Sequence, residues 1–169
     1  MTSGQDSSSK NRKWLVLTAV SVGAFISTLS SSIVNISLPT IADDLGVGIS
    51  DIEWIVVAYL LTAGSLLLTF GRLGDIVGYK RVYIGGFALF TVASVLCGLA
   101  QSAGELTVLR VLQGIGFGMI QALVPAIVTA VFPPHERGRA LGLTAVSISL
   151  GLTVGPALGG VLTQWVSWR

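Results

Sequence analysis

The sequence predicts an all-α integral membrane protein, and three observations support that fold class. Hydrophobic residues make up 52% of the 169 residues and charged residues only 11%, whereas a soluble domain carries about 25% charged residues. Long apolar stretches recur along the chain, and short charged connectors separate them. Basic and acidic connectors alternate, as they do in a chain that crosses a membrane repeatedly. A chain of this length is too short to hide so much apolar surface in a core.

Five stretches are long enough to cross about 30 Å of hydrocarbon as helices. They cover residues 14–38, 54–70, 82–100, 105–132 and 140–163. Helices are predicted rather than barrel strands, because strands would be about half as long and would alternate polar and apolar residues. Residues 14–169 are therefore expected to form one transmembrane domain. The serine-rich residues 1–13 are expected to form a disordered cytoplasmic tail.

The basic residues predict the orientation of these spans. In a layout of five alternating spans, eight of them fall on one side: Lys10, Arg12, Lys13, Arg72, Lys80, Arg81, Arg137 and Arg139. The opposite connectors carry Asp43, Asp44, Asp51, Glu53 and Glu105. The positive-inside rule therefore places the N-terminus in the cytoplasm of a multi-pass protein of the plasma membrane.

Arg110 is the candidate functional residue with the strongest physical basis. It is a lone cation well inside an apolar stretch, where a charge costs at least about 2.5–3.5 kcal/mol on insertion scales. One interpretation is that Arg110 extends to the outer interface, because it lies near the start of its span. The other is that it faces an aqueous cavity, together with Gln113 one turn further on. Ser30 and Asn35 of the first span are expected to share that cavity.

Glycines form a repeat in the last span, at positions 151, 155 and 159. Spaced four residues apart, they leave a smooth groove along one helix face, and Pro156 can kink the helix. Helix packing alone explains this pattern, and a gating surface that slides against a neighbouring helix is the alternative. The connector over residues 71–81 is also rich in glycine and charge. It is interpreted either as a positive-inside anchor or as a functional loop in which Asp75 caps a helix or pairs with a basic neighbour.

Three motifs, in order, resemble those of the major facilitator superfamily. The connector matches its cytoplasmic loop pattern G-x-L-x-D-x-x-G-x-K-R, through Gly71, Asp75, Gly78, Lys80 and Arg81, with Arg72 inside it. Residues 106–116 match the fourth-helix pattern L-x-x-x-R-x-x-Q-G-x-G, which includes Arg110 and Gln113. The last span matches the antiporter pattern G-x-x-x-G-P-x-x-G-G, through Gly151, Gly155, Pro156, Gly159 and Gly160.

The resemblance implies a function and a set of partners. The run around Asn35 is most similar to the fourteen-helix drug:proton antiporter branch, although residues 29–32 hold no acidic residue where that branch often has one. The chain is then expected to supply five helices of the N-terminal half of a transporter, as an incomplete fragment that also lacks the C-terminal half. It would export drugs or small amphipathic molecules in exchange for protons, with residues 71–81 as a cytoplasmic latch and the glycines of the last span as a gating motif.

Other functions stay open or are disfavoured. Within transport, the alternative is a sugar or metabolite facilitator or symporter. Outside transport, it is a short membrane protein that associates with partner helices. The sequence shows no cluster of a nucleophile, a base and an acid, so an enzyme is not predicted. The lone His135 and the lone Cys97 predict no metal site, and neither a cofactor nor a nucleic-acid partner is expected.

Overall fold

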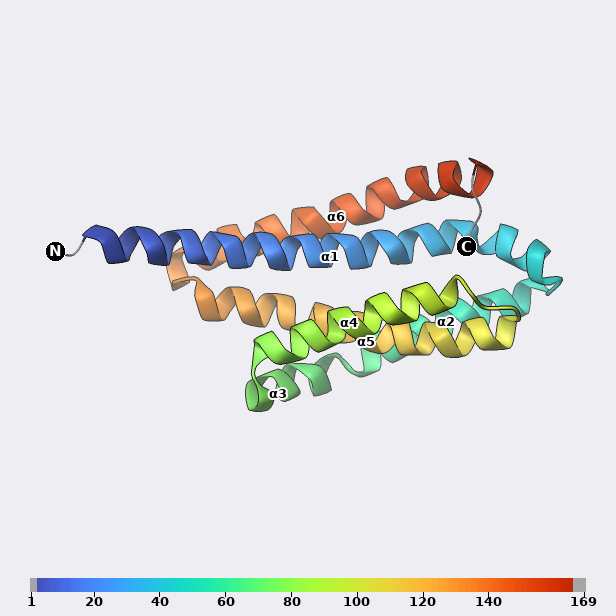
Figure 1. The fold of residues 1–169 in the computed structure, drawn as a ribbon, viewed down its shortest axis with the longest axis horizontal. Coiled ribbons are helices and arrows are strands. Elements are labelled where there is room, and N and C mark those ends of the chain that lie inside the picture. Colours follow the sequence, from blue (N-terminus) through green and yellow to red (C-terminus); the bar gives the residue numbers. More distant parts are fainter. Residues whose placement is uncertain (1–2, 166–169) are drawn as a thin grey trace.

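The computed structural model describes residues 3–165. Over this range the chain forms helices and short connections: α1 (Ser3–Leu45), α2 (Ile49–Ser65), α3 (Leu67–Val77), α4 (Tyr79–Cys97), α5 (Ala103–Val131) and α6 (Pro134–Trp165). Helix α6 lies along α1, and α5 packs against α2, α3 and α4 (Figure 1). The bundle therefore consists of an α1–α6 pair beside an α2–α5 group.

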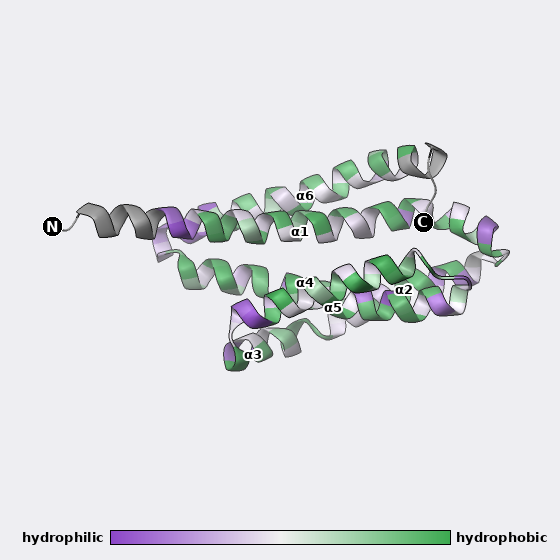
Figure 2. Cartoon of the chain, in the orientation of Figure 1, coloured by the Kyte–Doolittle hydropathy of each residue, from purple (hydrophilic) through white to green (hydrophobic). Residues whose placement is uncertain are grey.

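The helices have the lengths and composition that a membrane requires. Among the described residues, the four stretches 11–45, 79–97, 103–131 and 134–161 are long and apolar enough to cross a bilayer. The α2–α3 pair makes a fifth span if its two helices, bent by 44°, are counted together. Large apolar side chains cover much of the outside, and Leu68 is 89% exposed. Most of the length of the helices is coloured as hydrophobic in Figure 2. The all-α membrane fold class is thus confirmed.

Several helix ends differ from the predicted ones. Helix α1 begins at Ser3, so residues 3–13, expected as a disordered tail, are helical, and residues 1–2 lie outside the described residues. The same helix continues past Pro39 to Leu45, because a proline removes one backbone bond without making a helix end obligatory. The predicted span 54–70 is instead split at Leu66. The break follows Gly64 and Ser65, a residue pair that often accompanies kinks.

Local sequence signals explain the early starts of α5 and α6. The Ser102 hydroxyl accepts a 3.3 Å hydrogen bond from the Glu105 backbone N–H, and the Glu105 carboxylate accepts a 3.0 Å bond from the Gln101 backbone N–H. This is a side-chain cap of the S-x-x-E type, so α5 begins at Ala103 rather than at Glu105. Helix α6 begins at Pro134 rather than at Ala140, because proline is well suited to the first helical position.

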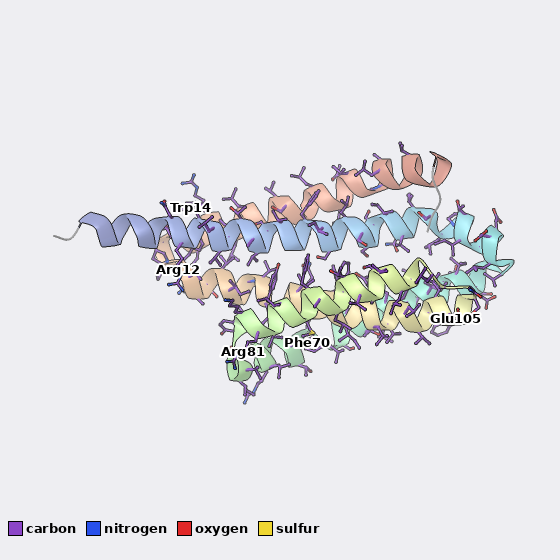
Figure 3. All side chains as sticks on the ribbon, in the orientation of Figure 1. Arg12, Trp14, Phe70, Arg81 and Glu105 are labelled. Carbon is purple, nitrogen blue, oxygen red and sulfur yellow. The ribbon has the colours of Figure 1, made fainter. Side chains whose placement is uncertain are left out.

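Basic and acidic residues mostly occupy opposite ends of the bundle. Figure 3 shows Arg12 and Arg81 at one end and Glu105 at the other. At the basic end, Lys13 pairs with Glu136 of α6, and the Trp14 ring meets the Phe132 ring edge-on at 5.6 Å. These contacts join α1, about three turns after its start, to the α5–α6 connection. The charge asymmetry that the sequence predicts is therefore also an asymmetry in space.

Candidate functional site

Arg110 lies on α5 and is completely buried, at 0% exposure. It is the largest of the fully buried side chains among the described residues. Because no part of the guanidinium is exposed, the side chain does not extend to the helix end in the manner of a snorkelling arginine. A buried cation needs hydrogen bonds and favourable neighbours to offset the loss of hydration. Part of this compensation comes from α5 itself and part from two neighbouring helices.

A chain of hydrogen bonds fixes the guanidinium on one side. Its Nη1 donates to Gln113 Oε1 at 2.6 Å, and Gln113 Nε2 donates to Ser94 Oγ of α4 at 2.6 Å. Ser94 Oγ in turn donates to the Phe90 carbonyl at 2.7 Å. Each side-chain acceptor in this chain is itself held in place, because its residue donates the next hydrogen bond. The Arg110 side chain is therefore anchored to both α5 and α4.

The Tyr59 ring of α2 lies against the guanidinium. The guanidinium carbon is 4.1 Å from the ring centroid, well within the range of a cation–π interaction, which contributes about 0.5–2 kcal/mol. Tyr59 itself is 1% exposed and packs against Phe117 at a centroid distance of 5.5 Å. Residues from α2, α4 and α5 thus hold Arg110 in one orientation.

A cavity of about 310 Å³ borders this network, between α1, α4 and α5. Its polar lining comes from Ser30, Ser37, Ser94, Arg110 and Gln113. Apolar residues line the rest, including Ile26, Leu29 and Ile33 of α1. No aspartate or glutamate is among the described residues that line it. An apolar cavity with a few convergent polar groups is the usual form of a small-molecule site.

The structure brings together three of the four residues predicted for this cavity. Arg110, Gln113 and Ser30 line it, whereas Asn35 is not among the described residues that line this cavity. Asn35 lies beside a separate pocket that also includes Pro39 and Glu53. The reason is helical geometry, because Asn35 is rotated by about 140° from Ser30 around α1.

Two important contributors were not predicted, Tyr59 and Ser94. Each is a polar side chain within an apolar span, which is the signal that could have identified them. Neither stands in a motif with Arg110, and each comes from a different helix. Ser37 was not predicted either, although it lies two turns after Ser30 on the same face of α1 and this spacing could have identified it.

The glycines of the last span pack against α1. A Cβ atom on Gly151 would lie 3.0 Å from the Phe25 carbonyl oxygen, and one on Gly159 would lie 2.8 Å from Ile36 Cγ2. At Gly155 the close neighbour is the Ser32 side chain. The groove predicted along this face is present and lets the two helices approach closely. Pro156 is exposed and Gly160 is intermediate, and the gating role of the motif stays a prediction.

The connector over residues 71–81 is mostly helical. Gly71, Arg72 and Asp75 lie in α3, Lys80 and Arg81 lie in α4, and Gly78 makes the turn between them. Gly78 has a φ of +101°, a conformation that side-chain-bearing residues rarely adopt. Asp75 Oδ1 accepts a 2.6 Å hydrogen bond from the Tyr79 hydroxyl. This bond replaces the ion pair with Arg72, Lys80 or Arg81 that was one interpretation of the motif.

Several membrane-crossing helices around a mostly apolar cavity that borders a buried cation are typical of a membrane transporter. The Major Facilitator Superfamily matches residues 20–169 of this chain. The chain belongs to the major facilitator superfamily.

Comparisons with individual proteins agree with this family. The chain is 40% identical to the riboflavin transporter RibZ of Clostridioides difficile, over 93% of this chain and 34% of that protein. It is 36% identical to the tetracenomycin C resistance and export protein of Streptomyces glaucescens, over 95% of this chain and 30% of that protein. The chain therefore spans about a third of the length of these curated relatives.

A solved structure has the same fold. A bacterial homologue of the human lysosomal transporter Spinster, in an inward-facing and occupied conformation, superposes with a TM-score of 0.80 at 20% identity. The match covers 89% of this chain and 32% of that one. The described helices are thus arranged as the corresponding helices of a transporter.

Proposed function

We propose that this chain forms the N-terminal helices of a proton-coupled secondary transporter that exports drugs or other small amphipathic molecules. The buried Arg110–Gln113–Ser94 network beside the cavity supports this proposal most directly. Intramembrane charges usually mark substrate or ion pathways. Relatives include a protein named for tetracenomycin C export and a Bacillus subtilis multidrug transporter.

The complete activity requires more helices than this chain provides. We infer that a C-terminal half, contributed by the longer protein, closes the cavity from the opposite side. The two halves would rock around a site near the middle of the membrane and expose it to each side in turn. The proton gradient is the energy source in this proposal, so no cofactor takes part.

Flux measurements in inside-out vesicles test the proposal. The complete transporter that carries this segment is expressed, a proton gradient is imposed, and the lumenal pH is followed with an acridine dye. Riboflavin, ethidium and 2-naphthoate are then added in turn. At least one compound is expected to discharge the gradient and accumulate in the vesicles, while vesicles without the transporter show neither effect. Accumulation that is unchanged when the gradient is collapsed would contradict proton coupling and favour a facilitator.

One alternative substrate has a specific observation in its favour. The relative named as a riboflavin transporter is 40% identical to this chain, a higher identity than that of the tetracenomycin C exporter. A flavin or a similar metabolite is therefore the second candidate substrate. The same vesicles distinguish the two classes, because uptake of riboflavin and uptake of ethidium are measured separately.

The N-terminus is expected to face the cytoplasm. The basic residues at one end of the bundle support this orientation through the positive-inside rule. In a background with Cys97→Ala, a cysteine introduced at Tyr79 should react with a membrane-impermeant maleimide only after the cells are opened. A cysteine introduced at Asp51 should react in intact cells. Labelling of position 79 from outside would reverse the topology.

Asp75 is expected to act in the transport cycle rather than in membrane insertion. Its carboxylate is exposed at a helix end and bonded to Tyr79, so Asp75→Asn removes a charge without opening a cavity. We expect the export rate to fall about tenfold, equivalent to about 1.4 kcal/mol, with unchanged expression. Tyr79→Phe removes only the hydroxyl that donates to Asp75, so it is the variant with which Asp75→Asn is compared. Wild-type export by Asp75→Asn would reduce this segment to a positive-inside anchor.

A further inference from the structure

The Arg110 guanidinium has one edge held by a hydrogen bond and one buried edge whose N–H groups have no hydrogen-bond partner among the described residues. Nη1 donates to Gln113, whereas Nε and Nη2 are buried and have no hydrogen-bond partner among the described residues. Their N–H groups form one side of the planar guanidinium and are parallel to each other. That side matches the two oxygens of a carboxylate in a bidentate arrangement. Buried donors without partners are rare in folded proteins, and these two are part of a charged group.

The surroundings keep this edge in place. The bond to Gln113 fixes the opposite side of the group, and the Tyr59 ring covers one of its faces at 4.1 Å. The guanidinium therefore cannot turn freely to find another acceptor. A donor pair that is oriented before its ligand arrives loses little entropy when the ligand binds.

The charge of the site selects the sign of its ligand. No described residue that lines the cavity is acidic, so nothing there neutralises Arg110. The described ion pairs lie elsewhere, around Glu136. In a cavity with apolar walls, an uncompensated cation attracts an anion and repels another cation more strongly than it would in water.

We propose that Nε and Nη2 of Arg110 bind the carboxylate of the transported molecule, so that this cavity selects organic anions with an apolar body. The inference rests on the proposed transport function and names its substrate class. Ile26, Leu29 and Ile33 supply an apolar wall for the body of the ligand, and Ser30 and Ser37 supply hydroxyls beside it. Gln113 is a positioning residue, because it acts on the ligand through Arg110.

Binding of a matched pair of probes tests the proposal. The complete transporter is purified in detergent, and the affinities of 2-naphthoate and 2-naphthamide are measured by calorimetry. The two compounds have the same apolar body, and only the first has a carboxylate. We expect the wild type to bind naphthoate at least about tenfold more tightly than naphthamide, because charge-assisted bidentate bonds are stronger than neutral ones.

Variants assign this preference to the guanidinium edge. Arg110→Lys keeps the charge but loses the fork, so the preference for naphthoate should fall about tenfold while naphthamide binding is unchanged. Gln113→Glu places a carboxylate against Nη1 and should also weaken naphthoate binding, which provides a second variant if Arg110→Lys does not fold. Arg12→Lys changes an exposed arginine away from the cavity and should bind both probes like the wild type.

Several results would overturn the proposal. Equal affinities for the two probes, binding of neither, or a preference that survives Arg110→Lys each contradict a carboxylate site at this edge. An acidic side chain from the longer protein could instead occupy the edge. The wild-type transporter would then bind naphthoate no more tightly than naphthamide, and Arg110→Lys would lower its melting temperature. Gradient-driven export without naphthoate binding would reject this inference alone. Naphthoate binding without gradient-driven export would reject proton-coupled export and leave the anion site standing.

Discussion

Replacing Arg110 by alanine is expected to abolish export while leaving membrane insertion intact or improved. The substitution removes a buried charge, which makes the helix easier to insert, and it removes the guanidinium that borders the cavity. It also ends the hydrogen bond to Gln113 and the contact with the Tyr59 ring. Gln113 keeps its bond to Ser94, so the α4–α5 packing should persist.

The lysine variant gives the scale of the effect. Arg110→Lys keeps a cation in the cavity but loses planar hydrogen bonding, and hydrogen bonds to charged groups contribute about 1.5–3 kcal/mol each. Export by this variant should therefore fall about 10- to 100-fold, a smaller loss than that of Arg110→Ala. Flux in vesicles is measured together with the amount of transporter in the membrane. Normal flux by Arg110→Ala at normal expression would remove Arg110 from the functional site.

The second large effect is expected at Gly155, where a bulky side chain should prevent α1 and α6 from packing. The Ser32 side chain already fills the space that a Cβ atom on Gly155 would need. Both residues are buried, so Gly155→Leu forces the helices apart. Overpacking of this kind costs about 1–3 kcal/mol or more. We expect a clear fall in melting temperature and in the yield of monodisperse transporter.

Position 142 on the same helix provides the matched control. A Cβ atom on Gly142 would meet no heavy atom within 4 Å, so Gly142→Leu should retain wild-type stability. The milder Gly155→Ala should be partly rescued by Ser32→Gly, because the second change makes room for the added methyl group. Equal melting temperatures for Gly155→Leu and Gly142→Leu would show that the α1–α6 contact contributes nothing to stability.

The sequence was sufficient to locate the membrane spans and to single out Arg110 as a charge in an unusual environment. Uninterrupted apolar runs determine where a helix can sit in a bilayer, and a lone charge inside one is conspicuous because of its cost. Helix ends were less predictable. The cap at Ser102 and the proline at position 134 were both visible in the sequence, but hydropathy gives more weight to the middle of a span than to its ends.

The partners of Arg110 could not be predicted in full, because they depend on how separate helices pack. Gln113 was found through its spacing within one helix, where geometry follows directly from residue number. Tyr59 and Ser94 belong to other helices, and their distance from Arg110 depends on helix rotation and depth. Asn35 shows that polarity alone does not place a residue in the cavity, because its position on α1 is rotated by about 140° from that of Ser30.

The close contact between α1 and α6 also bears on how the protein is made. Ser32 donates its hydroxyl to the Leu152 carbonyl at 3.4 Å, across 120 positions of the chain. Helix α1 leaves the ribosome first, and its surface around Ser32 remains without its final neighbour until the last of the described helices has been synthesised. Late arrival of a partner leaves polar side chains in contact with lipid or with the insertion machinery. Because synthesis runs from the N-terminus, the α1 surface that α6 covers can therefore be buried only after α6 has been made.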